Sequence, residues 1–296
     1  MVWAQSLLIK FVKKSVKDLS SKKTLKVLKS VITCAGKGTR LLPFTKELPK
    51  EMAPIFSLGK NGIEIKPLIQ QIFENLFTIG VREFCFISGK TKRSLQDHFY
   101  PDQQKDIPSQ LSSFYEMITN SKIAWMNQLI PKGFGDAVLA SKPFVNNDVF
   151  LVQAGDVVIS SQIHSSITKL IELSKNEEIE AAFLIQNVTD PERHGIVTTE
   201  KDEDISLVTK VVEKPENPET DLGIMPFYFF RSSIFDALNT VTPGYGNEIQ
   251  LTDAIQKLIE SGKNVAAIKM DKETILDVGT PESYWNALNL SFKSSN

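Results

Sequence analysis

The sequence of 296 residues has few residues of the kinds that dominate several protein classes. Its two cysteines, Cys34 and Cys85, lie in apolar runs, so we expect reduced core thiols; no Cys/His spacing indicates a zinc site. With 15 Gly and 14 Pro, the chain is not collagen-like or of low complexity. No apolar run approaches the roughly 18 residues that a membrane-spanning helix needs. We therefore expect a soluble, cytoplasmic protein with one large α/β domain or two average ones.

The net charge is close to zero but unevenly distributed. Lys and Arg together number 34 against 35 Asp and Glu, so no overall basic field favours binding to nucleic acid. Residues 1–30 carry eight lysines against one aspartate, a net +7, which leaves −8 for the remainder. We expect a basic N-terminal extension, either a solvated helix or sequence upstream of the fold, with a membrane-surface or partner helix as the alternative. We expect no signal peptide here, because Lys10 interrupts the apolar run that such a peptide needs.

From residue 31 onward, apolar strand-like runs alternate with helical patterns. Strands are expected at 31–34, 83–88, 149–152, 181–185, 208–212, 227–230 and 265–268, and helices at 67–77, 249–259 and 281–290. This alternation predicts an α/β fold over 31–290, a Rossmann-like, mainly parallel mixed sheet flanked by helices, followed by a short C-terminal tail over 291–296. In such sheets ligands bind beyond the carboxyl ends of the strands, so the loops that follow strands are where the chemistry is expected.

The loop after the first strand has the composition of an anion site. Its glycines allow backbone N–H groups to approach a ligand, and Arg40 and Lys50 add permanent positive charges, as a polyphosphate site requires. A simple turn is the alternative. A dinucleotide fingerprint is excluded because Leu41 stands where its third glycine would be, and the P-loop-like run at 88–91 is excluded because Phe84 replaces the required glycine.

The string GKGTRLLPFTKELPKEMAPI at 36–55 resembles the signature GxGTRxxPxTKxxPKEM of the sugar-1-phosphate nucleotidyltransferases. Its PKEM ending is most similar to the bacterial-type UTP–glucose-1-phosphate uridylyltransferases, and the resemblance continues in order through nearly all of 30–290. It implies that 31–290 form a nucleotidyltransferase domain that makes UDP-glucose and pyrophosphate from UTP and glucose 1-phosphate, with Mg²⁺, as a homo-oligomer. A dTTP-using thymidylyltransferase and a non-catalytic paralogue that binds sugar nucleotides are the alternatives.

The resemblance also implies the nucleotide-binding residues. The glycine-rich loop contributes Ala35, Gly36, Gly38 and Thr39, and Arg40 and Lys50 would grip the triphosphate as catalytic cations. In the string that begins at Gln128, Gln128 and Gly133 would read the pyrimidine edge, for which an amide offers both a donor and an acceptor. Phe134 and Asp136 depart from the family pattern, which has Leu and His there.

The implied magnesium ligands are Asp156, which ends a predicted strand, and Asp277 in a DxGT string. A helix cap is the alternative for Asp156, and a helix entry for Asp277. Val157 departs from the family, which has a second Asp or Asn at that position.

For the sugar phosphate, the resemblance implies Lys214 as a third catalytic cation and Gly195, Glu213 and Glu248 as sugar contacts, with a helix cap as the alternative for Glu248. His194 replaces the usual Tyr before Gly195. The link at 57–65 is longer than in the family, and no role is predicted for it.

Overall fold

The computed structural model describes residues 28–90, 92–101, 108–159, 165–201, 203–270 and 275–295. The chain divides into two compact units. Among the described residues, unit 1 contains 132–152, 165–201 and 203–270, and unit 2 contains 28–90, 92–101, 108–131, 153–159 and 275–295. The predicted helical pattern at the N-terminus lies outside the described residues.

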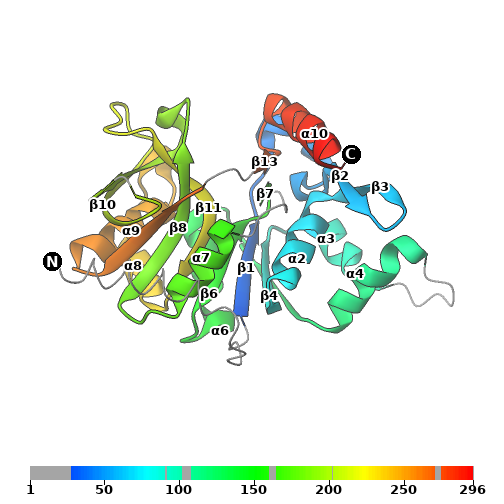
Figure 1. Cartoon of the computed structure of the whole chain (residues 1–296), viewed down its shortest axis with the longest axis horizontal. Helices are drawn as coiled ribbons and strands as arrows, with labels where there is room; N and C mark the ends of the chain where they lie inside the picture. The colour runs from blue at the N-terminus through cyan, green and yellow to red at the C-terminus, as the bar shows by residue number, and fades with distance from the viewer. Residues whose placement is uncertain are drawn as a thin grey trace. The chain divides into compact units, whose positions relative to one another are not determined.

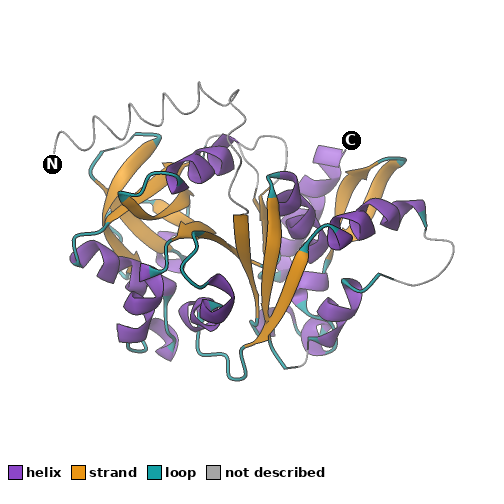
Figure 2. Ribbon diagram, turned by 90° about the horizontal axis from the view of Figure 1, so that it is seen from below, coloured by secondary structure: helices purple, strands orange, loops and turns teal. Residues whose placement is uncertain are grey.

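Unit 2 is built on a parallel sheet whose strands follow the order β5-β4-β1. These are β1 (Leu28–Cys34), β4 (Val81–Ser88) and β5 (Lys122–Asn127). Helix α2 (Leu68–Thr78) packs against β4, and α4 (Ser109–Thr119) packs against β5 (Figures 1 and 2). The short helix α3 (Arg93–His98) follows β4. The core is rich in aromatic rings, and Phe73 of α2 contacts Phe84 of β4 at a centroid distance of 4.6 Å.

The link at 57–65, for which no role was predicted, is a β-hairpin of β2 (Pro54–Gly59) and β3 (Gly62–Pro67). The C-terminal helix α10 (Pro281–Ser295) lies beside this hairpin (Figure 1). The Tyr284 hydroxyl donates to the Pro54 carbonyl at 3.0 Å, and the rings of Phe56 and Phe292 meet edge to face at 5.1 Å. Residues 291–295, predicted as a tail, are therefore part of a packed helix.

Unit 1 contains a mixed sheet in which the strands follow the order β6-β11-β8-β12-β10-β9. Their bounds are β6 (Phe150–Ala154, of which 150–152 belong to unit 1), β8 (Ile179–Asn187), β9 (Gly195–Thr199), β10 (Ile205–Glu213), β11 (Leu222–Phe230) and β12 (Asn264–Lys269). Strand β9 also pairs with β11, so β11, β8, β12, β10 and β9 close into a ring. The helices of this unit are α5 (Phe134–Ala140), α6 (Lys142–Val145), α7 (Ser165–Ser174), α8 (Ser233–Thr240) and α9 (Leu251–Glu260).

The predicted strands and helices are confirmed, and β1 begins at Leu28, earlier than expected. The expectation of a mainly parallel sheet holds for unit 2 only. In unit 1, β8 and β12 are parallel, but β11–β8, β10–β12, β10–β9 and β11–β9 are antiparallel. For the β10–β9 pair the reason is local, because the link between these two strands is too short for a crossover helix. In the described part of the chain, each helix is too short or too polar to span a bilayer.

Candidate functional site

In the loop after β1, side chains from later in the chain lie close to the backbone of the glycines. Gly38 has a φ of +66°, and a Cβ there would lie 3.0 Å from the Thr45 methyl group. The Thr45 hydroxyl donates to the Gly38 carbonyl at 2.7 Å, which closes the loop. A Cβ on Gly36 would lie 3.6 Å from Nζ of Lys50. The lysine ammonium group is therefore placed directly beside the backbone of the glycine-rich loop.

Lys50 forms an ion pair with Asp156, the second residue after β6. The backbone N–H of Gly155 donates to the Thr33 carbonyl at 2.9 Å, and a Cβ on Gly155 would meet the Cys34 sulfur at 2.6 Å. This close approach fixes Asp156 at the end of β1. Burial alone raises the pKa of a carboxyl, but the charge and hydrogen bond of Lys50 hold the pKa of Asp156 below its ordinary value.

A short strand pair brings Asp277 to Asp156. Strand β7 (Val157–Ile159) pairs with β13 (Ile275–Asp277) so that Asp277 lies opposite Val157, and the Val278 N–H donates to the Asp156 carbonyl at 3.1 Å. The Gly279 N–H donates to Asp277 at 2.7 Å. Burial, and after it the charge of Asp156, raises the pKa of Asp277.

The predicted cation Arg40 lies on the exposed 3₁₀ turn η1 (Thr39–Leu41), together with Thr39. A Cβ on Gly279 would lie 3.2 Å from Nη2 of Arg40 and 3.0 Å from Oδ1 of Asp277. Gly279 of the DxGT string therefore lies against both the guanidinium group of Arg40 and the carboxylate of Asp277. Unit 2 thus brings Arg40, Lys50, Asp156 and Asp277 together, as the resemblance implied, while their roles remain predictions.

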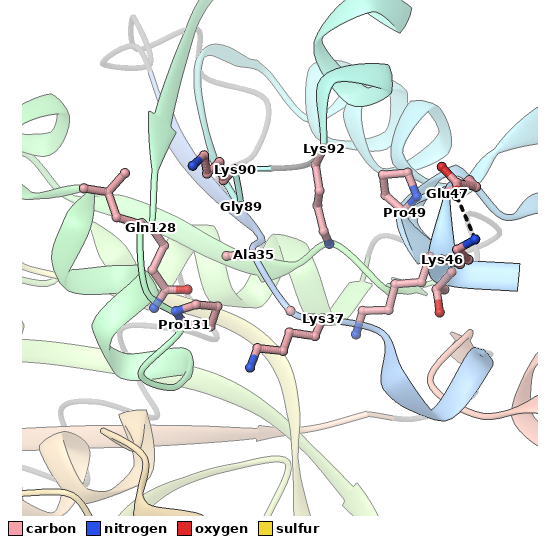
Figure 3. A pocket seen from close by; sticks show the side chains of 14 residues that line it. Ala35, Lys37, Lys46, Glu47, Pro49, Gly89, Lys90, Lys92, Gln128 and Pro131 are labelled. Atoms are coloured by element: carbon pink, nitrogen blue, oxygen red, sulfur yellow. Dashed lines mark ion pairs between the residues drawn. The ribbon is translucent and has the colours of Figure 1, made fainter. Parts of the chain in front are cut away.

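A pocket of about 250 Å³ lies beside this cluster in unit 2. Of the predicted nucleotide-binding residues, Ala35, Gly36, Lys50 and Gln128 line it. The remaining charge of the lining comes from Lys37, Lys46, Lys90, Lys92 and Glu47. Figure 3 shows Gln128 on the opposite side of the pocket from the Lys46–Glu47 ion pair, whose atoms are 3.6 Å apart. The excess of lysine suits an anionic ligand that carries several charges.

Lys90 and Lys92 line this pocket, although neither was predicted from the sequence. They belong to the run SGKT and the residue after it, which was dismissed as a false P-loop. A signal was available, since this loop follows β4, the parallel neighbour of β1, and the carboxyl ends of neighbouring parallel strands meet at one edge of a sheet. Glu51, which binds Lys92, was missed as well.

Unit 1 brings two of the predicted sugar-binding residues, Gly195 and Glu213, together. Gly195 of β9 lies opposite Glu213 of β10, and a Cβ on Gly195 would meet the Thr252 methyl group at 2.7 Å and Oε2 of Glu213 at 3.2 Å. The Thr252 hydroxyl donates to the same carboxylate oxygen at 3.0 Å. Glu213 is therefore fixed in orientation by Thr252, a residue that sequence reasoning did not select.

Lys214 extends from the end of β10 with a φ of +43°, a left-handed conformation that is uncommon for lysine. Its N–H donates to the His194 carbonyl at 2.9 Å, and its ammonium group lies 2.9 Å from Oε1 of Glu213. His194, which replaces the family tyrosine, places its Nε2 3.2 Å from Asp190. The backbone of His194 thus holds Lys214, while its ring faces Asp190.

Gly133 and Glu248, predicted for nucleotide and sugar, are neighbours in unit 1. Gly133 has a φ of +115°, and a Cβ there would lie 2.6 Å from the Ile249 carbonyl oxygen and 2.9 Å from Cβ of Glu248. The Ile249 backbone bonds to both sides of this turn, donating to the Lys132 carbonyl at 2.7 Å and accepting from Gly135 at 2.9 Å. Asp136 occupies the first turn of α5, where the partial positive charge of the helix N-terminus stabilises a carboxylate.

Comparison with known proteins identifies the family. Residues 29–293 match the family model of nucleotidyl transferases. A UTP–glucose-1-phosphate uridylyltransferase of Streptococcus pneumoniae serotype 4 is 35% identical over 250 residues, which cover 79% of this chain and 81% of that protein. A crystal structure of UDP-glucose pyrophosphorylase complexed with UDP-glucose matches with a TM-score of 0.80 and 30% identity, over 91% of this chain and 100% of that one. The chain therefore belongs to the nucleotidyl transferase family.

Proposed function

We propose that this protein transfers the uridylyl group of UTP to glucose 1-phosphate, forming UDP-glucose and pyrophosphate. The relatives named for this reaction and the match to a UDP-glucose pyrophosphorylase support it. The observation that carries the proposal is that Lys50 belongs both to the lysine-lined pocket and to the ion pair with Asp156, next to Asp277. In such an arrangement the cations can hold the oxygens of a triphosphate, and the carboxylates can hold the Mg²⁺ that accompanies it.

The reaction joins two polyanions, so its main barrier is the approach of like charges. A phosphate oxygen of glucose 1-phosphate attacks the α-phosphorus of UTP, a new P–O bond forms, and pyrophosphate leaves with the electrons of the bond between the α-phosphorus and the bridging oxygen. The attacking oxygen is already ionised at neutral pH, so no general base is required. Catalysis consists of positioning and charge neutralisation, in which Arg40 and Lys50 hold the triphosphate and Lys214 holds the sugar phosphate.

The residues of unit 2 fit a magnesium ion. Asp277 has a raised pKa because it is buried beside Asp156, and a divalent cation would remove the repulsion between these carboxylates. In the part of the chain that the structure describes, no group of three or more His, Cys, Asp or Glu side chains could hold a metal. This suits Mg²⁺, which typically binds to one or two carboxylates and to substrate phosphates. When bound by Asp156 and Asp277, it would neutralise charge on the phosphates.

The proposal is tested by pyrophosphate release with glucose 1-phosphate and Mg²⁺, comparing UTP, dTTP, CTP and ATP. We expect UTP to be preferred. Preference for dTTP would keep the mechanism and make the protein a thymidylyltransferase, because uracil and thymine offer the same hydrogen bonds. Silence with each nucleotide, and with the 1-phosphates of mannose, galactose and N-acetylglucosamine, would instead favour the non-catalytic paralogue.

Single variants test the assigned cations. Lys50→Ala or Lys214→Ala should lower the rate about a hundredfold, the usual cost of removing one group that stabilises transition-state charge. Lys122→Ala is the matched control, because Lys122 is 82% exposed on β5 and pairs only at the surface with Glu83. A Lys214→Ala enzyme with the wild-type rate would refute the role of Lys214.

A cytoplasmic location and a homo-oligomeric state belong to the proposal as well. The buried free thiols of Cys34 and Cys85 support a reducing compartment. The oligomeric state rests on the resemblance and is tested by light scattering of the purified protein.

A further inference from the structure

An exposed aromatic ring lies over the ammonium group of Lys214. Nζ of Lys214 is 4.8 Å from the centre of the Tyr245 ring, within the range of a cation–π interaction. Tyr245 is 56% exposed, so burial in a core does not account for its position. It is the second residue of the string GYGNEIQLTD at 244–253, and no functional role was predicted for it.

The backbone around Tyr245 is held in place by several contacts. The buried amide of Gln250 donates to the Tyr245 carbonyl at 3.0 Å, and the Gly244 N–H donates to the Glu248 carbonyl at 2.9 Å. Gly246 and Asn247 both have positive φ, +66° and +58°, which makes a tight reversal after the ring. The loop therefore presents the ring in a defined place.

Lys214 is also confined by Glu213. Its ammonium group lies 2.9 Å from Oε1 of Glu213, whose second oxygen accepts from Thr252 at 3.0 Å. A lysine side chain has a flexible stem of four carbons, and its conformational freedom is lost when the ammonium group binds a phosphate. The carboxylate and the ring, which both lie close to this ammonium group, remove much of that freedom before the ligand arrives.

We infer that Tyr245 is a positioning residue for Lys214. The ring of Tyr245 holds the Lys214 ammonium group in place for the phosphate of the sugar 1-phosphate. The inference rests on the proposed function, in which Lys214 binds that phosphate. Tyr245 acts through Lys214 and takes no direct part in the reaction.

The test is steady-state kinetics of UDP-glucose formation. Tyr245→Leu should raise the KM for glucose 1-phosphate about three- to fivefold, the size expected for an exposed cation–π contact, with kcat and the KM for UTP unchanged. Tyr245→Phe keeps the ring and should behave as the wild type. Tyr100→Leu is the matched control, because Tyr100 is a tyrosine of unit 2 with 68% exposure, and it should change neither constant.

A double-variant comparison separates positioning from direct contact with the sugar. In a Lys214→Met background, Tyr245→Leu should cause no further rise in KM, because the partner of the ring is already gone. A further rise, a wild-type KM for Tyr245→Leu, or an equal defect in Tyr245→Phe would overturn the inference while leaving the proposed function intact. Absence of turnover by the wild-type protein would refute the proposed function, and the inference with it.

Discussion

Glu51 and Lys92 form an ion pair that is almost completely withdrawn from solvent. Nζ of Lys92 lies 2.8 Å from each carboxylate oxygen, and the side chains are 1% and 8% exposed. Glu51 follows Lys50 on the 3₁₀ turn η3 (Lys50–Met52), whereas Lys92 lies in the loop after β4. The pair therefore joins the loops on which the lining of the unit 2 pocket is built.

Glu51→Gln should destabilise the protein by about 3 kcal/mol or more, because it leaves the Lys92 ammonium group buried without its counter-charge. Urea unfolding of the purified protein measures the change. Glu47→Gln is the control, because the side chain of Glu47 is 80% exposed and its loss should alter stability by less than about 0.5 kcal/mol.

The double variant Glu51→Gln/Lys92→Met tests whether the unpaired charge of Lys92 causes the loss of stability. It removes both charges, so most of the lost stability should return. If the single variant unfolds at the wild-type urea concentration, or if the double variant is less stable than the single one, the buried ion pair does not stabilise these loops.

Asp277→Asn should separate activity from stability. Burial and the charge of Asp156 raise the pKa of Asp277, so at neutral pH its charge is less favourable in the folded state than in the unfolded chain. The amide should therefore leave the protein at least as stable as the wild type, while activity with Mg²⁺ falls about a hundredfold.

Thermal unfolding and Mg²⁺-dependent pyrophosphate release measure the two effects of Asp277→Asn. Chelation of Mg²⁺ should abolish activity of the wild type without lowering its unfolding temperature in the absence of nucleotide. A variant that melts well below the wild type would mean that Asp277 is a structural residue.

Gly133→Ala should be more damaging than the same change at Gly80. Both glycines have positive φ, +115° and +102°, so both variants strain the backbone, by about 1–2 kcal/mol. A Cβ on Gly80 meets no atom within 4 Å, whereas one on Gly133 meets the Ile249 carbonyl oxygen at 2.6 Å. The clash should add about 1–3 kcal/mol to the loss at Gly133.

Urea unfolding compares the two glycine variants directly. Because Gly133 lies against Glu248 and Ile249, Gly133→Ala should also raise the KM for UTP or for glucose 1-phosphate, whereas Gly80→Ala should keep wild-type kinetics. Equal losses of stability would show that the segment at 248–250 shifts to accommodate the methyl group.

The sequence predicts well what is local or lies at a strand end. Helix α2 is predicted nearly to the residue because its apolar side chains repeat with the helical period and face the core. Asp156 is predicted as a metal ligand from the family resemblance together with its place at the end of a predicted strand, and the structure places it two residues after β6, beside the loop after β1. Periodicity is enough to predict the helix, whereas the role of Asp156 needs the resemblance as well.

Pairing between distant residues was not predictable. The β7–β13 ladder that aligns Asp277 with Val157 joins segments more than a hundred residues apart, and nothing in either short run specifies its register. The β2–β3 hairpin was missed because Ile63 and Ile65 are 40% and 66% exposed, so its apolar residues do not mark a buried face. The contacts of Glu51 with Lys92 and of Tyr245 with Lys214 are likewise non-local.

His98 should make stability depend on pH. Its Nε2 lies 3.1 Å from Oε1 of Gln70, and its ring stacks on Phe114 at a centroid distance of 5.1 Å. Burial lowers the pKa of His98, so the folded state holds this ring neutral at a pH where the unfolded chain binds a proton. Stability from this group is therefore complete above the ordinary histidine pKa of about 6.5 and is lost as the pH falls through the lowered value.

Urea unfolding of the wild type and of His98→Gln between pH 8 and pH 5 isolates this contribution, because the carboxylates that titrate in the same range are common to both proteins. The glutamine cannot be protonated, so the variant should lose less stability than the wild type as the pH falls below about 6.5. At pH 8 the wild type should be the more stable, since only it stacks an aromatic ring on Phe114. Parallel pH curves would show that His98 is protonated equally in the folded and unfolded states, and hence that its ring is open to water.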